Sequence, residues 1–109
     1  MHTEQVVRLS SKEHVILKLL INAGSEGLYG LQLVELSDGE LARGTVYVTL
    51  DRMQDKGLVE SQQEKEARVR GIPRRIYRPT GYGAQVYQRW EQLQALSGHP
   101  GRQLVWQPA

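Results

Sequence analysis

The chain has 109 residues, a length typical of one compact domain. Apolar residues make up 39% of it and charged residues 24%, a balance that excludes wholesale disorder. Because cysteine is absent, disulfides, thiolate catalysis and thiolate metal sites are excluded together. The longest apolar stretch, at residues 15–21, is interrupted by Lys18 and is too short to span a bilayer. With no signal peptide at the first residues, we expect a soluble, cytoplasmic protein that does not enter the membrane.

Three helices are predicted in the first half of the chain, at residues 12–23, 29–36 and 43–56. Ser10 with Glu13, or Ser11 alone, gives the first helix its start. The turn at residues 37–39 ends the second helix. In the third, the apolar residues on one face are Val46, Leu50 and Met53.

The helical spacing of apolar residues ends at Gly57. Residues 58–64 and 74–78 are predicted strands of a β-hairpin with a charged tip. Thr80 is a suitable cap for a final helix at residues 82–96. The predicted fold class is therefore α+β, mostly α: a winged helix-turn-helix of three helices and a two-stranded wing at residues 9–80, a C-terminal dimerisation helix at 81–96, and a tail at 97–109.

The net charge of +2 is unevenly distributed along the chain. Residues 65–78 carry a local charge of +5, whereas the remainder carries −3. A concentrated basic segment on an acidic body indicates a polyanionic partner. The alternative is a solvated loop whose charges only keep the protein in solution.

Enzymatic activity is not expected. His2, His14 and His99 do not lie at metal-ligand spacing with one another or with a carboxylate. No glycine-rich phosphate loop follows a strand, and no serine lies in a nucleophile elbow. We therefore expect no catalytic residues, no metal and no cofactor.

The third helix is the predicted recognition helix for double-stranded DNA. With its apolar face turned inward, small, hydroxyl and arginine side chains face outward, and these suit entry into the major groove. Asp51 and Asp55 fit less well, because carboxylates repel phosphates. The alternative is a surface helix that contacts nothing. The predicted DNA-binding residues are Arg43, Gly44, Thr45, Tyr47, Val48, Thr49, Arg52, Arg68, Arg70, Arg74 and Arg75.

Residues 9–96 resemble the PadR-type winged-helix transcriptional regulators. The resemblance is carried by Gly-Thr-Val-Tyr at residues 44–47 and by Gly-Ile-Pro-Arg-Arg-Ile-Tyr-Arg at residues 71–78, followed by Thr80. The sequence departs from the family pattern at Ala42, where a capping hydroxyl is usual, at Leu31, where an aromatic residue is common, and at Pro79, which we expect to end the second wing strand early. The resemblance implies a dimeric regulator, usually a repressor, that binds a pseudo-palindromic operator.

The final helix carries a broad apolar stripe. Its members are Tyr82, Val86, Tyr87, Trp90 and Leu93. A short chain leaves little core for five such residues to cover, so we expect them to form a homodimer interface, as in the smaller PadR subgroup with one C-terminal helix. The alternative is packing onto the chain's own first helix, and both can hold for different residues.

A small aromatic effector is a further prediction, which the resemblance implies. Some PadR-type regulators respond to flat aromatic molecules near the dimer interface, and Trp90 and Tyr87 would line such a site here. The alternative is that both rings only fill the core. A rival function for the whole chain is a winged-helix adaptor or effector-sensing module that acts through a protein partner rather than DNA.

Overall fold

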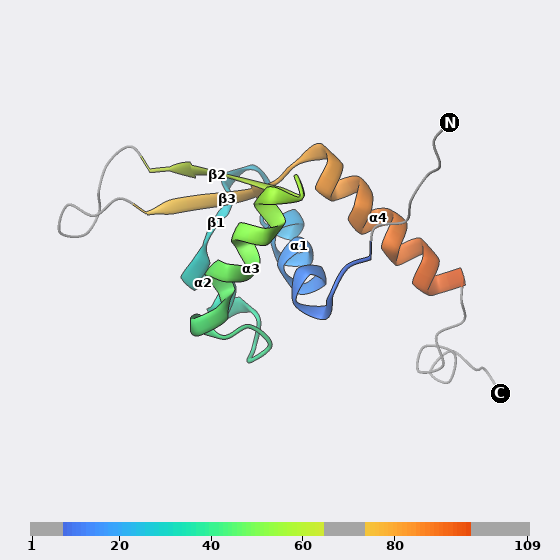
Figure 1. Cartoon of the computed structure of the whole chain (residues 1–109), viewed down its shortest axis with the longest axis horizontal. Helices are drawn as coiled ribbons and strands as arrows, with labels where there is room; N and C mark the ends of the chain where they lie inside the picture. The colour runs from blue at the N-terminus through green and yellow to red at the C-terminus, as the bar shows by residue number, and fades with distance from the viewer. Residues whose placement is uncertain (1–7, 65–73, 97–109) are drawn as a thin grey trace.

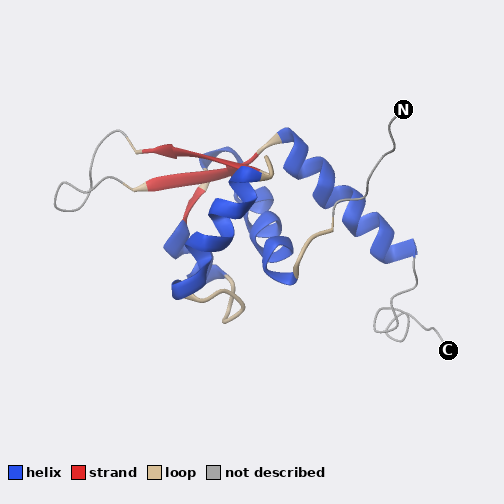
Figure 2. Ribbon diagram, in the orientation of Figure 1, coloured by secondary structure: helices blue, strands red, loops and turns tan. Residues whose placement is uncertain are grey.

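Four α-helices and a three-stranded antiparallel sheet make up the described part of this computed structural model, residues 8–64 and 74–96 (Figures 1 and 2). The elements are α1 (Ser11–Ala23), the 3-10 turn η1 (Gly24–Glu26), β1 (Leu28–Tyr29), α2 (Gly30–Leu36), α3 (Arg43–Asp55), β2 (Val59–Gln63), β3 (Arg75–Pro79) and α4 (Gly81–Leu96). The wing, formed by β2 and β3, projects from one side of the helices, and α4 projects from the other (Figure 1). None of the described helices has the length and apolar character that a membrane span requires. The predicted fold class is confirmed.

Helix α1 begins after Ser10, the first of the two predicted starts. The Ser10 hydroxyl accepts a hydrogen bond from the Glu13 backbone N–H at 3.2 Å, and the Glu13 carboxylate accepts one from the Ser10 N–H at 3.0 Å. This reciprocal capping box satisfies two N–H groups that the helix itself leaves without partners. Gly24 ends the helix in a left-handed conformation, with φ of 80°, as its position after the apolar run predicts.

The connection from α2 to α3 depends on the buried side chain of Ser37. Its hydroxyl donates to the Val34 carbonyl at 2.8 Å and accepts from the Leu41 N–H at 2.9 Å. Helix α3 then begins without a capping side chain, because Ala42 has none to offer. The Ala42 carbonyl accepts from the backbone N–H of Thr45 and Val46, so the helix starts at the predicted residue despite this departure.

The wing hairpin has a third strand that the sequence analysis missed. The wing itself has the two predicted strands, but residue 29, predicted as the start of the second helix, belongs to β1, which pairs with β3 so that Leu28 lies opposite Tyr77. A strand of two residues shows no periodicity, and only its distant partner defines it. Gly27 permits the approach, because a Cβ at this residue would lie 2.6 Å from Ile76 Cγ2.

Strands β2 and β3 pair with Val59 opposite Pro79 and Gln63 opposite Arg75. Pro79 is the last residue of β3, one residue beyond the predicted end, so it did not shorten the strand. A proline is tolerated there because β3 ends at this residue and needs no further ladder hydrogen bond from it.

Helix α4 is held closely against the start of β2. The Thr80 hydroxyl accepts from the Gly83 N–H at 2.8 Å, as predicted for its cap, and also donates to the Gly57 carbonyl at 2.6 Å. Gly83 lies so near the strand that an added Cβ would be 2.0 Å from the Leu58 carbonyl oxygen. These contacts fix the point from which α4 leaves the body of the protein.

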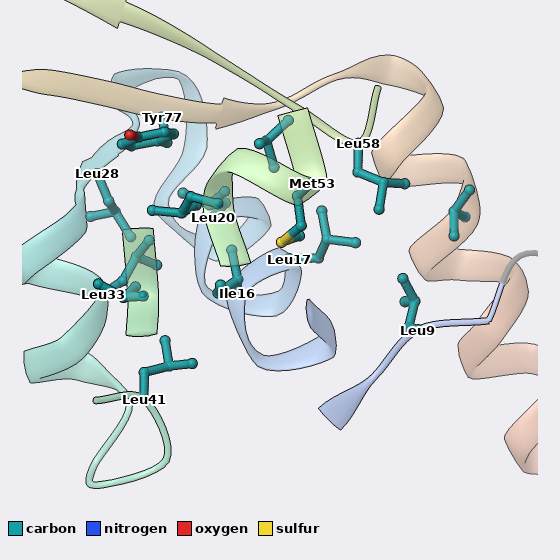
Figure 3. Packing of buried hydrophobic residues seen from close by; sticks show 14 residues of the cluster. Leu9, Ile16, Leu17, Leu20, Leu28, Leu33, Leu41, Met53, Leu58 and Tyr77 are labelled. Atoms are coloured by element: carbon teal, nitrogen blue, oxygen red, sulfur yellow. The ribbon is translucent and has the colours of Figure 1, made fainter. Parts of the chain in front are cut away.

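One hydrophobic core joins all four helices to the sheet (Figure 3). Its fully covered side chains come mainly from α1 and α3, with Leu33 from α2 and Tyr77 from β3 beside them. Glu13 is buried at the edge of this core, where Lys56 donates to its carboxylate at 2.7 Å. The ion pair ties the first turn of α1 to the end of α3, which carries the candidate interface.

Candidate nucleic-acid interface

Helix α3 has one buried face and one exposed face, as the sequence predicts. Val46, Leu50 and Met53 are fully covered by the core. The predicted contact residues of this helix are exposed except for Thr49, which is half-buried: Arg43, Gly44, Thr45, Tyr47, Val48, Thr49 and Arg52. The outer face therefore presents hydroxyl, guanidinium and small apolar groups together.

The two threonines on this face differ in what they can offer a ligand. The Thr49 hydroxyl donates to the Thr45 carbonyl at 3.1 Å within the helix. A hydroxyl bonded in this way retains its lone pairs as acceptors. Thr45 lies one turn earlier and is exposed, so it is the better placed of the two to donate to a base or a phosphate.

Tyr47 lies between α3 and the first residue of α2. A Cβ at Gly30 would be 2.5 Å from Cε1 of the tyrosine ring, so the ring rests directly on the glycine backbone. The side chain is nevertheless 46% exposed. A packed ring in a residue that is still partly exposed agrees with the intermediate position predicted from the helical wheel.

Two of the three described wing arginines, Arg74 and Arg75, lie on opposite faces of the sheet. Arg74 places its guanidinium carbon 4.5 Å from the centre of the Tyr29 ring, on the face away from the core. Arg75 shares the face of Tyr77, which packs into the core beside α3. The pKa of the Tyr77 hydroxyl is raised by burial, with Arg75 lowering it and Asp51 of α3 raising it further. Among the described wing arginines, Arg75 is therefore the one on the side of α3.

The remaining wing predictions, Arg68 and Arg70, lie outside the described residues. Arg74 and Arg75 both have partners within the chain: Arg74 lies over the Tyr29 ring, and Arg75 donates to the Ser61 hydroxyl at 3.3 Å. Asp51 and Asp55 are exposed in the second half of α3. Positive charge is thus supplied by Arg43 at the start of α3, by Arg52 in its last turn and by the wing, and negative charge by Asp51 and Asp55.

The stripe predicted on α4 divides into two groups. Val86 is buried in the core of the single chain, and Tyr87 and Trp90 are half-buried against it. Tyr82 and Leu93 are 47% and 40% exposed. Leu96 was not among the predicted residues, but it lies three residues after Leu93 and extends the same face. It is 81% exposed.

The two aromatic residues predicted to line an effector site already have contacts within the chain. The Tyr87 ring stacks on His14 with ring centres 5.2 Å apart, and Trp90 packs against the core. A hollow of about 450 Å³ lies elsewhere, on the outer face of the sheet, where Tyr29, Glu64, Ile76 and Arg78 contribute to its walls. Neither Tyr87 nor Trp90 lines it.

A helix-turn-helix with an exposed second helix, followed by a basic antiparallel wing, defines the winged-helix class of transcription regulators. The chain belongs within this class to the transcriptional regulator PadR-like family, whose model matches residues 16–89. The resemblance found in the sequence motifs is thereby confirmed.

Solved structures of regulators share this fold at low sequence identity. A PadR family regulator from Clostridium difficile superposes with a TM-score of 0.70 at 22% identity, covering 88% of this chain and 99% of that one. A PadR-like regulator from Bacillus cereus gives 0.63 at 23%, covering 87% and 91%. PcaV from Streptomyces coelicolor, solved with its natural ligand, gives 0.60 at 21%, covering 89% and 68%. No curated protein sequence matches this chain significantly.

Proposed function

We propose that this protein is a sequence-specific DNA-binding repressor that acts as a homodimer on a pseudo-palindromic operator. Helix α3 enters the major groove, and the wing contacts phosphates or the minor groove. The regulator has no enzymatic activity of its own, in keeping with the family to which it belongs.

One observation carries the proposal: the solvent face of α3 and the face of the wing beside it bear complementary groups for DNA. Arg43, Thr45 and Arg52 supply donors along the helix, and Arg75 supplies a cation on the same side of the sheet. Arginine and threonine are among the side chains that contact base edges and phosphates. The core beneath α3 is fully packed, which holds these groups on a rigid element.

The homodimer is proposed through α4. Tyr82, Leu93 and Leu96 are large apolar side chains that the single chain leaves exposed along this helix. Each could contribute about 1.5–3 kcal/mol on full burial, before the cost of association is subtracted. A two-fold dimer would also present two copies of α3, which is the arrangement that a pseudo-palindromic operator requires.

The aromatic effector stays a prediction. Tyr87 stacks on His14 and Trp90 packs against the core, but both rings are only half-buried.

The direct test is a mobility-shift assay of the full chain against genomic fragments, including its own promoter. We expect one or a few fragments to remain bound in the presence of excess nonspecific DNA. If binding to every fragment disappears under that competition, the regulator proposal fails and the adaptor that acts through a protein partner takes its place.

The repressor role needs a separate measurement. In cell-free transcription from a promoter whose fragment the protein binds, we expect added protein to lower the amount of transcript. An increase in transcript would show an activator and contradict this part of the proposal.

A further inference from the structure

In the first two turns of α3, the centre of the exposed face carries no hydrogen-bonding side chain. Gly44 and Val48 lie four residues apart, on the side of the helix opposite the buried Val46, Leu50 and Met53. Val48 is 52% exposed, and the space that a Cβ at Gly44 would occupy is open. In these two turns, the part of the helix that stands farthest from the core is therefore small and apolar.

This apolar centre is framed by polar groups. Thr45 and Arg52 lie on one side of it, and Asp51 lies on the other. A valine among such neighbours has no donor or acceptor with which to distinguish bases. It can discriminate only by shape and by apolar contact.

The position of the charges also limits how the helix can approach a duplex. Asp51 and Asp55 occupy the later turns of the exposed face and would be repelled by phosphates. Arg43 lies at the first residue of α3, where the positive end of the helix dipole adds to its charge. The first two turns are thus the part that enters the groove most deeply, and Gly44 allows the backbone to approach there.

We propose that Val48 contacts the C5-methyl group of a thymine in each half of the operator. This inference rests on the proposed function, since it requires α3 in the major groove. The thymine methyl is the one methyl group that the bases of unmodified DNA expose in that groove, and apolar side chains recognise it by contact. A thymine methyl beneath Val48 would give this exposed apolar side chain an apolar contact.

The experiment uses uracil, which differs from thymine only by the absence of that methyl group. The full chain selects duplexes from a random-sequence library, and each thymine of the tightest-binding duplex is replaced in turn by uracil. Loss of one buried methyl corresponds to about a fourfold weaker affinity. We expect that loss at one thymine in each half-site for the native protein, and no loss at the same position for Val48→Ala.

The matched control is Leu36→Ala, which truncates another exposed apolar side chain at the end of α2. This variant should keep the full effect of uracil. The inference is overturned if no uracil substitution weakens binding of the native protein. It is also overturned if a variant that still binds specifically gives the wrong response: Val48→Ala keeps the effect of uracil, or Thr45→Ala abolishes it. If the selection yields no duplex bound more tightly than the starting library, the proposed function itself fails, which is a distinct result.

Discussion

His14 of α1 and Glu91 of α4 lie 2.5 Å apart, between Nε2 of the imidazole and Oε2 of the carboxylate, although 77 residues separate them in sequence. The Tyr87 ring stacks on the same imidazole. Burial and the neighbouring Glu91, by its charge and a hydrogen bond, raise the pKa of the Tyr87 hydroxyl. The three side chains fasten the helix proposed for dimerisation to the body that carries α3.

The contribution of this cluster to stability can be measured by replacing Glu91. We expect Glu91→Ala to lower the free energy of unfolding by about 1 kcal/mol, because a half-buried hydrogen bond is lost. Urea denaturation followed by circular dichroism measures the change. Gln88→Ala on the exposed side of α4 is the control and should unfold like the native protein. An equal midpoint for Glu91→Ala would show that the contact adds nothing.

A second prediction concerns pH and Glu13. Burial raises the pKa of this carboxyl, but the hydrogen bond and charge of Lys56 and the hydrogen bonds from Ser10 outweigh it, so the pKa lies below the ordinary 4.5. As the pH falls, Glu13 of the unfolded chain is protonated before Glu13 of the folded protein. The stability that the ionised carboxylate contributes above pH 4.5 is therefore lost as the pH drops through the lower pKa of the folded state.

We therefore expect the unfolding free energy of the native protein to fall more steeply below pH 4.5 than that of Glu13→Gln. Denaturant titrations between neutral and acidic pH measure both slopes. Glu35→Gln, exposed on α2, is the control and should keep the native slope. If Glu13→Gln also follows the native slope, the buried ion pair with Lys56 does not contribute to the pH dependence.

A third prediction tests the close approach of α4 to the sheet. Gly83→Ala would force a Cβ to within 2.0 Å of the Leu58 carbonyl oxygen, so the helix or the strand must move. We expect a loss of about 1–3 kcal/mol or more, as for other overpacked sites. Gly81→Ala, in the same turn but facing open space, should be neutral or stabilising in thermal melts. Equal melting temperatures for the two variants would contradict the packing described here.

Local signals explain why most of the fold could be predicted. Each of these signals acts within about three residues of a helix end, so the sequence alone reveals it. They are the capping box of Ser10 and Glu13, the stop at Gly24 and the cap of Thr80. The recognition helix was predictable because its core face repeats at helical spacing over the whole element.

The features that sequence reasoning missed depend on contacts between distant residues. Strand β1 exists only because Leu28 pairs with Tyr77, and two residues give no pattern of their own. The placement of Arg74 and Arg75 on opposite faces follows from the register of β3, which the sequence alone leaves undetermined. On α4, the same apolar spacing includes the buried Val86 and the exposed Leu93, and only packing against α1 and the sheet separates them.

This division of α4 makes the dimer proposal testable without damage to the core. We expect Leu93→Glu to convert the protein to a folded monomer, because the side chain is exposed in the single chain and would place a charge at the interface. Light scattering gives the mass, and circular dichroism checks the fold. Gln92→Glu on the adjacent exposed position should remain dimeric. A native protein that is already monomeric at micromolar concentration would contradict the proposal.

In the proposed complex, α3 reads the DNA sequence while the wing supplies general affinity. The most direct measurement compares the affinity of Arg52→Ala and Arg75→Ala for the selected operator and for random DNA at several salt concentrations. We expect Arg52→Ala to cost about 1–3 kcal/mol on the operator and far less on random DNA. Arg75→Ala should weaken both alike and reduce the salt slope by about one unit. An operator-selective loss for Arg75→Ala with a uniform loss for Arg52→Ala would contradict the account.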